Sequence, residues 1–307
     1  MIQTVTINPS LDRYYDIHQV DINALNRVLE KSDFPGGKGI NIARVLNELG
    51  TTSTVYGFVG GQNGDMLVEA CSELNTHFIR IAKNTRVNHK FRDLTNHTIT
   101  EFNEFGPDVT DKEFMILQHC LSRDILANDW CVLGGSAPKG LEDDVYVKLM
   151  AIIRHRHGKV MVSCDMPWIK PALESLPDVV KVNLQELERL AQVKFEDIKE
   201  IKRYCLEWIT RGVGLFIVSL GSDGALFVSE EKTIYCESLE VTVVNTVGAG
   251  DAMLAGIVKC LQEESSIEEL ASFSIACATA AVARDEIAVG SLDTVQDYQK
   301  QVIIREL

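Results

Sequence analysis

The sequence predicts an α/β protein in which a doubly wound, mainly parallel sheet carries a small β-sheet lid. Two observations support this prediction. From about residue 110 onward, short apolar β-branched runs alternate with longer stretches of helical periodicity, which is the pattern of β-α-β units. In the first third of the chain, two segments instead alternate apolar and polar residues, which is typical of strands that expose one face.

The core strands are expected in four apolar runs, WCVLGG, KVMVSCD, DVVKVN and LFIVSLG, which begin at residues 130, 159, 178 and 215. Helices are expected near residues 111–126, 142–157, 196–212, 250–264 and 266–284. Ligands of such sheets bind at the carboxyl ends of the strands. Polar residues stand at these ends, namely Ser136, Asp165, Asn183 and Ser219.

Segments 11–35 and 86–105 are expected to form the lid, and segments 1–10, 36–85 and 106–307 to form the nucleotide- and substrate-binding core. Two short strand pairs bury little surface by themselves. The edges of a small sheet also carry unpaired backbone groups, which a second copy of the chain would cover. We therefore expect a homodimer joined through the lid.

The 307 residues carry a formal net charge of −14 at pH 7 and are 46% hydrophobic, a composition that is ordinary for a folded soluble protein. The negative charge disfavours nucleic acid and anionic membranes as partners, whereas a small phosphorylated substrate needs only a local cluster of cations. The eight cysteines form no C-x-x-C pair. Neither a signal peptide nor a membrane-spanning stretch is evident, so we expect a reduced, cytoplasmic protein.

The segment NTVGAGDAMLAG, residues 245–256, places its least hindered backbone directly before an acid. A helix is expected to begin at Asp251. Glycine allows backbone to approach a ligand closely, and helix N-termini present unpaired N–H groups to anions. Gly248, Ala249 and Gly250 are therefore candidates for an anion site, although an acidic helix start after a tight turn explains the same pattern.

Two earlier segments also place polar side chains beside turns or glycines. NPSLD ends in Asp12, which an Asn-Pro turn alone would explain. PGGKGINIARVLNELG places Gly37 and Lys38 before a helix and Asn41 in its first turn. A glycine loop that enters a packed helix and a ligand-binding loop are both consistent with this second segment.

The segment TRVNHK offers two cations, Arg86 and Lys90, at alternate positions of an expected strand. Both side chains would point to one face of that strand. Solvated surface charge is the usual explanation for such a pair. In a chain this acidic, the two cations are also candidates for holding a substrate phosphate.

Two segments of the second half carry further candidates. KVNLQELE contains Asn183 and Glu186 in N-x-x-E spacing, which suits Mg²⁺ binding through water and equally suits a helix cap. SLGSDGA places Ser219, Gly221 and Gly224 in a turn between expected strands.

Taken in order, these segments resemble the phosphofructokinase B family of ribokinase-like carbohydrate kinases over nearly the whole chain. The resemblance rests on NPSLD, GGKGINIARVL, TRVN, TEFN, GGSAPKG, KVNLQELE, SLGSDGA and NTVGAGDAMLAG. Within the family the chain is most similar to 1-phosphofructokinases and then to tagatose-6-phosphate kinases. The resemblance implies a doubly wound core with a β lid that often pairs between subunits.

The resemblance also implies roles for individual residues. Asp251 would be the base on the sugar hydroxyl, and Gly248, Ala249 and Gly250 would bind the transferred phosphoryl group. Sugar binding would fall to Asp12, Gly37 and Asn41, and the phosphate already on the sugar to Lys38, Arg86 and Ser136. The nucleotide would contact Lys181, Asn183, Ser219, Gly221 and Gly224, and Mg²⁺ would bind through water at Asn183 and Glu186. Arg27 matches a lid position that reaches a neighbouring subunit.

The implied activity is MgATP-dependent phosphorylation of a ketohexose phosphate, foremost fructose 1-phosphate to fructose 1,6-bisphosphate. Tagatose-6-phosphate and fructose-6-phosphate kinases are alternatives. Ribokinases and nucleoside kinases act on uncharged substrates, so Arg86, Lys38 and Lys90 disfavour them. A non-catalytic sugar-phosphate or nucleotide sensor is disfavoured by the retained Asp251, and a nicotinamide dehydrogenase by the absence of G-x-G-x-x-G after the first strand.

Two departures from the family pattern are expected to matter. The chain has Val182 where the family usually has proline, which would change how the strand end aims Asn183. The segment ARDEIAVG, residues 283–290, is unusually acidic from Arg284 to Glu286, so adenine contacts and a monovalent-cation site there are not assigned.

Overall fold

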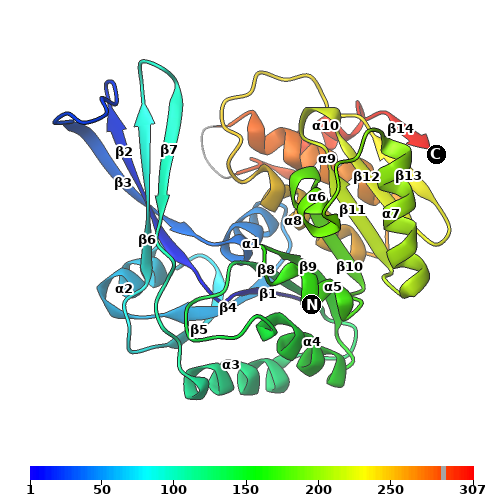
Figure 1. The fold of residues 1–307 in the computed structure, drawn as a ribbon, viewed down its shortest axis with the longest axis horizontal. Coiled ribbons are helices and arrows are strands. Elements are labelled where there is room, and N and C mark those ends of the chain that lie inside the picture. Colours follow the sequence, from blue (N-terminus) through cyan, green and yellow to red (C-terminus); the bar gives the residue numbers. More distant parts are fainter. Residues whose placement is uncertain (285–287) are drawn as a thin grey trace.

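The computed structural model describes residues 1–284 and 288–307. A ten-stranded mixed sheet forms the core, and a separate four-stranded sheet projects from it (Figure 1). The predicted fold class, an α/β core with a mainly parallel sheet and a small second sheet, is therefore confirmed.

The large sheet has the strand order β14-β13-β12-β11-β10-β9-β8-β1-β4-β5. From β5 to β11 neighbouring strands run parallel, and β12, β13 and β14 add an antiparallel edge. The strands are β1 (Ile2–Thr6), β4 (Ser53–Val59), β5 (Asn75–Arg80), β8 (Trp130–Gly135), β9 (Lys159–Cys164), β10 (Val179–Asn183), β11 (Leu215–Ser219), β12 (Ala225–Ser229), β13 (Thr233–Cys236) and β14 (Ile304–Glu306). All four predicted core strands are present as β8 to β11.

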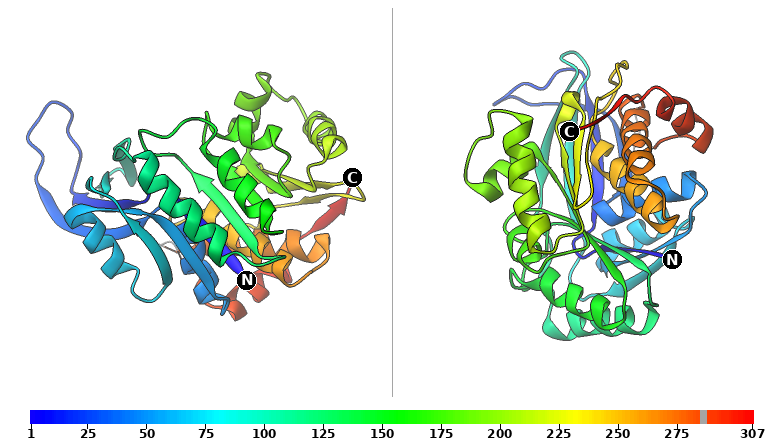
Figure 2. Two further views of the ribbon diagram at one scale, coloured as in Figure 1. Left: turned by 90° about the horizontal axis from the view of Figure 1, so that it is seen from below. Right: turned by 90° about the vertical axis from the view of Figure 1, so that its right-hand side faces the viewer.

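Helices cover both faces of this sheet (Figure 2). One apolar core lies under α3 (Asp111–Asp124), α4 (Val145–His155), α5 (Ile169–Glu174), α6 (Leu184–Ala191) and α7 (Ile198–Arg211). The opposite face packs against α1 (Lys38–Glu48), α2 (Gly61–Ala70), α8 (Ala249–Gln262), α9 (Ile267–Val282) and α10 (Leu292–Gln299). The five predicted helices correspond to α3, α4, α7, α8 and α9. None of the helices in the described ranges combines the length and apolarity needed to cross a bilayer.

The small sheet consists of β2 (Ser10–Ile17), β3 (Val28–Gly36), β6 (Arg86–Asp93) and β7 (Thr98–Asn103), in the order β3-β2-β6-β7. Its two hairpins are antiparallel, whereas the central β2–β6 pair is parallel. Because side chains alternate across a strand, the sheet has two unlike faces. One face carries polar side chains such as Asp12 and Lys90. The other carries an aromatic cluster of Tyr15, His89, Phe91 and Phe102.

The strand order reverses direction at β1 and β8. From β1 the chain continues outward through β4 and β5, whereas β8 lies on the other side of β1 and leads to β9, β10 and β11. Ligands of doubly wound sheets bind outside the carboxyl ends of the strands at such a reversal. The small sheet begins at Ser10, just beyond the carboxyl end of β1, so it stands beside this position (Figure 1).

Candidate active site

Asp251 lies in the first turn of α8. The helix begins at Ala249, two residues earlier than predicted, because Gly248 takes the cap position. Gly248 has φ 86°, a left-handed conformation that favours glycine, and its carbonyl oxygen accepts the Ala252 N–H at 2.8 Å. The first N–H groups of a helix have no intrahelical acceptors. Those of Ala249 and Gly250 therefore add partial positive charge beside the carboxylate.

Two side chains from the first turn of α1 contact this carboxylate. Asn41 Nδ2 donates to Asp251 Oδ2 at 2.7 Å, and Lys38 Nζ lies 3.7 Å from Asp251 Oδ1. Helix α1 starts directly after Gly37, whose φ of 125° suits glycine and whose added Cβ would lie 2.6 Å from Thr6 Cγ2. The N-termini of α1 and α8 thus meet, and they fix the carboxylate between an amide and an ammonium.

Lys38 remains a cation in this position. Burial lowers its pKa, but Asp251, Asp165 and Glu186 outweigh burial and raise the pKa above the ordinary lysine value. Lys38 therefore lies at the Asp251 end of the site. The sequence had associated it with Arg86 and Ser136, and its side-chain stem lies against Gly134, two residues before Ser136.

Lys181, on β10, is a second cation at the Asp251 end. Its pKa is lowered to about 8, foremost by burial and then by Lys38, and Glu186 and Asp251 offset this only in part. A Cβ added to Gly250 would lie 3.5 Å from the Lys181 Nζ. No hydrogen bond or ion pair engages this amine within the described ranges. An anion placed there would restore its full charge.

Asp12, on the polar face of the small sheet, is buried with 7% of its surface exposed. Oδ1 accepts hydrogen bonds from Ser10 Oγ at 2.7 Å and from Asn88 Nδ2 at 2.9 Å, and Oδ2 lies 3.0 Å from Lys90 Nζ. The sequence had grouped Lys90 with Arg86, either as solvated surface charge or as a candidate for holding a phosphate. The structure instead pairs Lys90 with Asp12.

Arg86 and Ser136 are brought together by Asn8. The guanidinium donates from Nε and Nη2 to the Asn8 carbonyl oxygen at 3.2 and 3.0 Å, and from Nη1 to the Glu104 carbonyl oxygen at 2.9 Å. Asn8 Nδ2 donates to Ser136 Oγ at 3.0 Å. Burial is the main cause that lowers the pKa of Arg86, which stays a cation because arginine starts so high. Its remaining N–H groups and the Ser136 hydroxyl hydrogen are left for an anion.

Asn183 and Glu186 form a helix cap. Asn183 Oδ1 accepts the Glu186 N–H at 2.8 Å, and Glu186 Oε2 accepts the Asn183 N–H at 2.8 Å. This reciprocal pair is the capping-box interpretation that the spacing allowed. Glu186 nevertheless lies close enough to Lys38 and Lys181 to raise their pKa values. Val182 is buried within β10 in register with Val218, so the strand continues to Asn183 without interruption.

Gly221 and Gly224 lie in the turn between β11 and β12, as predicted, whereas Ser219 belongs to the strand. Ser219 ends β11 in register with Asn183 of β10. Gly221 and Gly224 have φ values of 66° and 96°, and a Cβ on Gly224 would lie 2.0 Å from the Cys236 carbonyl oxygen. Of the acidic segment 284–286, only Arg284 is among the described residues.

Asp165 joins the site although the sequence marked it only as a polar residue at a strand end. The charges of Lys38, Arg86 and Glu186 lie close enough to Asp165 to shift its pKa. Part of its side chain is exposed to solvent, but the surrounding protein limits hydration of the carboxylate. This partial burial is the main cause that raises the pKa of Asp165. Lys38 lowers the pKa, and Glu186 raises it further.

Asn8 and Asn88 were likewise missed by the sequence argument. Asn8 opens the NPSLD segment, and Asn88 alternates with Arg86 and Lys90 in TRVNHK. The period of two would have placed Asn88 on their face.

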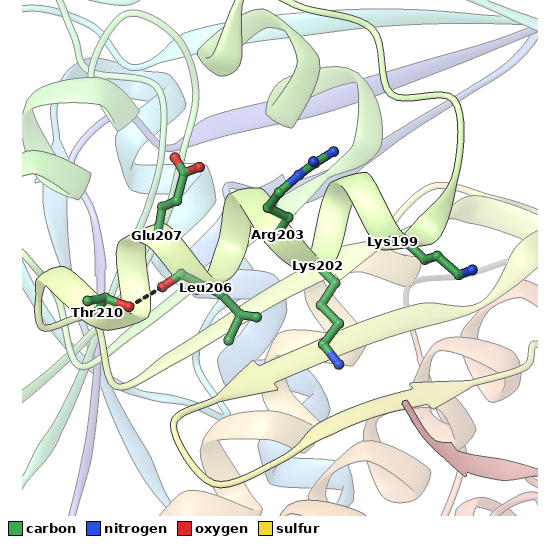
Figure 3. Close-up of a pocket in the computed structure, with 6 residues that line it drawn as sticks. All are labelled: Lys199, Lys202, Arg203, Leu206, Glu207 and Thr210. Carbon is green, nitrogen blue, oxygen red and sulfur yellow. Dashed lines mark hydrogen bonds between the residues drawn. The ribbon is translucent and has the colours of Figure 1, made fainter.

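An open hollow of about 410 Å³ lies on the outer side of α7 (Figure 3). It is lined by Lys199, Lys202, Arg203, Leu206, Glu207 and Thr210. All six come from this one helix and none belongs to the constellation around Asp251, so the hollow is separate from the candidate site.

Comparison with known proteins finds relatives over the full chain. It is 32% identical over 305 residues to the 1-phosphofructokinase of Borreliella burgdorferi, which covers 98% of this chain and 96% of the relative. It is 29% identical to the 1-phosphofructokinase of Bacillus subtilis, with all of both chains covered. The Escherichia coli phosphofructokinase-2 in complex with fructose-6-phosphate has a TM-score of 0.92 at 26% identity, with 98% of each chain covered. That enzyme also has a tetrameric inhibited form.

The family model of the pfkB family carbohydrate kinases matches residues 7–294. This range includes the candidate site residues described above, from Asn8 and Asp12 to Asp251. The match agrees with the resemblance that the sequence motifs indicated. The chain therefore belongs to the pfkB family of carbohydrate kinases, which transfer a phosphoryl group to a sugar hydroxyl.

Proposed function

We propose that the protein is an ATP-dependent kinase that converts D-fructose 1-phosphate to D-fructose 1,6-bisphosphate. The observation that carries this proposal is the oriented carboxylate of Asp251, held by Asn41 and Lys38 beside unpaired backbone N–H groups. Arg86 and Ser136 supply a second anion-binding end. The two relatives named 1-phosphofructokinase favour fructose 1-phosphate as the acceptor.

An ADP-release assay across fructose 1-phosphate, fructose 6-phosphate, tagatose 6-phosphate and unphosphorylated fructose tests this proposal. We expect the highest kcat/KM with fructose 1-phosphate. A preference for fructose 6-phosphate, the ligand of the Escherichia coli relative, or for tagatose 6-phosphate would replace the substrate but keep the reaction class. Binding of these sugars without any turnover would favour a sensor and contradict the proposal.

In the proposed reaction, Asp251 accepts the proton of the attacking sugar hydroxyl. Asn41 and Lys38 hold its carboxylate in place, so that little reorganisation accompanies attack. The N–H groups of Ala249 and Gly250, together with Lys38 and Lys181, stabilise negative charge on the transferred group. ATP would supply this phosphoryl group, and Mg²⁺, when bound, would neutralise charge on its oxygens. We propose that Lys38 acts here rather than on the phosphate already carried by the sugar, because its Nζ lies beside Asp251.

The acidic side chains near this end fit Mg²⁺ held through water. Mg²⁺ prefers oxygen ligands and keeps several of its waters. Glu186 uses only Oε2 in its cap, and Asp165 lies close to it. Within the described residues, no group of three His, Cys, Asp or Glu side chains converges tightly enough to hold a metal directly. Glu186 and Asp165 would therefore bind metal-bound waters, and Asn183 and the 219–224 turn would flank the nucleotide.

Nucleotide affinity is expected to fall above pH 8. The pKa of Lys181 is about 8 in the unliganded site, so its amine is charged below this pH and neutral above it. A bound polyphosphate favours the charged amine, so binding at higher pH requires proton uptake. We expect KM for MgATP to rise by up to about tenfold per pH unit above pH 8. Lys181→Met should abolish this alkaline dependence, while Lys194→Met, an exposed control, should retain it.

We further propose that segments 11–35 and 86–105 act as a lid and that two lids pair in a homodimer, with Arg27 directed at the neighbouring subunit. The aromatic face of the small sheet supports this proposal, because Phe102 is 62% exposed and such faces favour association. We expect a dimer in size-exclusion chromatography with light scattering. Phe102→Glu should yield a monomer with reduced turnover, whereas Met115→Glu on α3, a residue 56% exposed, should remain dimeric. A monomeric wild-type enzyme with full activity would contradict the proposal.

We propose that the enzyme acts in the cytoplasm, and its cysteines support this location. All eight cysteines are free and buried, and burial raises the pKa of Cys71 to about 11 and that of Cys236 to about 12. Such thiols are poor nucleophiles. A chain rich in unpaired cysteines suits a reducing compartment.

A further inference from the structure

Lys90 is a buried lysine of the lid that the proposed mechanism does not use. Its side chain is 6% exposed, and its Nζ lies 3.0 Å from Asp12 Oδ2, 3.8 Å from Glu101 Oε1 and 3.4 Å from the Tyr14 hydroxyl. A buried ammonium is costly unless it is paired and hydrogen-bonded. The lid therefore holds this charge between groups from both neighbouring strands.

The strand register explains how these groups meet. Tyr14, Lys90 and Glu101 are paired across β2, β6 and β7 and form one row on the polar face. Asp12 lies two residues before Tyr14 on the same face, so Lys90 reaches it along the diagonal. Burial lowers the pKa of Lys90, but Asp12, Tyr14 and Glu101 outweigh it and raise the pKa. Lys90 is therefore charged at any pH at which the enzyme would be assayed.

The contacts of Asp12 leave little of its carboxylate free. Each carboxylate oxygen accepts about two hydrogen bonds. Oδ1 already accepts from Ser10 and Asn88, and Oδ2 from Lys90. One accepting direction remains, on Oδ2 beside the Lys90 ammonium.

We infer that Lys90 is a positioning residue that makes Asp12 selective for the configuration of one sugar hydroxyl. The inference rests on the proposed function, in which Asp12 binds the sugar. By holding Oδ2, Lys90 leaves Asp12 a single direction from which to accept a hydroxyl hydrogen. A sugar phosphate with the opposite configuration at that carbon leaves this acceptor unpaired, and sites of this kind discriminate strongly. Without Lys90, Oδ2 has both accepting directions open and can accept a hydroxyl of either configuration.

Lys90→Met, which removes the charge and keeps much of the volume, is the test. Kinetics are measured with fructose 1-phosphate and with its C3 and C4 epimers, psicose 1-phosphate and tagatose 1-phosphate. We expect KM for fructose 1-phosphate to rise by about tenfold or more, with kcat and KM for MgATP changed less than about threefold, since a hydrogen-bonded charge is lost from the sugar end alone. The preference over at least one epimer should fall by about tenfold. Lys90→Arg should restore part of the affinity for fructose 1-phosphate and part of the epimer preference. Lys83→Met, at an exposed position before β6, should leave the KM and the epimer preference unchanged.

The outcomes distinguish this inference from the proposed function. If the wild type turns over none of the ketohexose phosphates, the proposed function fails. If the wild type is active and Lys90→Met loses stability or kcat but keeps its KM and its epimer preference, Lys90 is only structural and the inference is overturned. If Lys90→Met does not fold, Lys90→Gln is measured in the same way and with the same criteria.

Discussion

Asp251→Asn is expected to reduce kcat by about 10²–10⁴-fold, the usual contribution of a positioned general base. The substitution keeps the shape of the side chain in the first turn of α8 and removes only its capacity to take a proton. Asn41 and Lys38 would still surround it. The assay is steady-state turnover with fructose 1-phosphate, accompanied by calorimetric measurement of MgATP binding, which should change little.

A matched control is Asp293→Asn, because Asp293 also lies in the first turn of a helix, α10, and is exposed. It should leave kcat unchanged. Turnover by Asp251→Asn within a few-fold of wild type would remove Asp251 from the role of base. Loss of MgATP binding together with turnover would instead indicate that the carboxylate supports the nucleotide end of the site.

Arg86→Ala is expected to weaken sugar-phosphate binding by about 1.5–3 kcal/mol, the scale of a hydrogen bond to a charged group. This corresponds to a rise of about tenfold to 150-fold in KM for fructose 1-phosphate. Arg86 also binds the backbone carbonyls of Asn8 and Glu104, so a purely structural effect has to be separated. Unphosphorylated fructose provides the separation, because its kcat/KM should change far less than that of fructose 1-phosphate.

Arg13→Ala is the control for this variant. Arg13 also lies on the small sheet, but it forms a two-point ion pair with Asp33 of the same sheet, so its loss should leave KM unchanged. Equal losses for phosphorylated and unphosphorylated sugars in Arg86→Ala would show that Arg86 only supports the small sheet.

The sequence was most informative where the chain is buried on both sides. The strands β8 to β11 are nearly continuous apolar runs, as parallel strands under two helical layers must be. The edge strand β14 is exposed along its whole length, and the short helix α5 contains a proline, so neither gives such a signal. Helix α2 begins in GGQNGD, whose glycines and polar residues predict a loop. The helical structure of this segment depends on packing against α1 and β4.

For the candidate site, the sequence identified residues more readily than their partners. Local patterns of glycine before a helix pointed to Gly248, Asp251, Lys38 and Asn41. The structure brings these residues together. The pairing of Lys90 with Asp12 depends on the parallel register of β2 and β6, whose partners are about 76 residues apart in the chain. No local pattern specifies such a register. Asn183 and Glu186 show the converse, since one spacing predicted both a cap and a metal site and only the structure revealed the cap.

The parallel β2–β6 pairing also constrains the order in which the protein folds. Between these strands lie α1, β4, α2 and β5, and closing so long a loop is entropically costly until the intervening chain is compact. The small sheet can thus assemble only after this part of the core has formed. All of these elements precede α8 in the chain, so during synthesis the contacts of Asp12 with Asn88 and Lys90 can form before Asp251 is made.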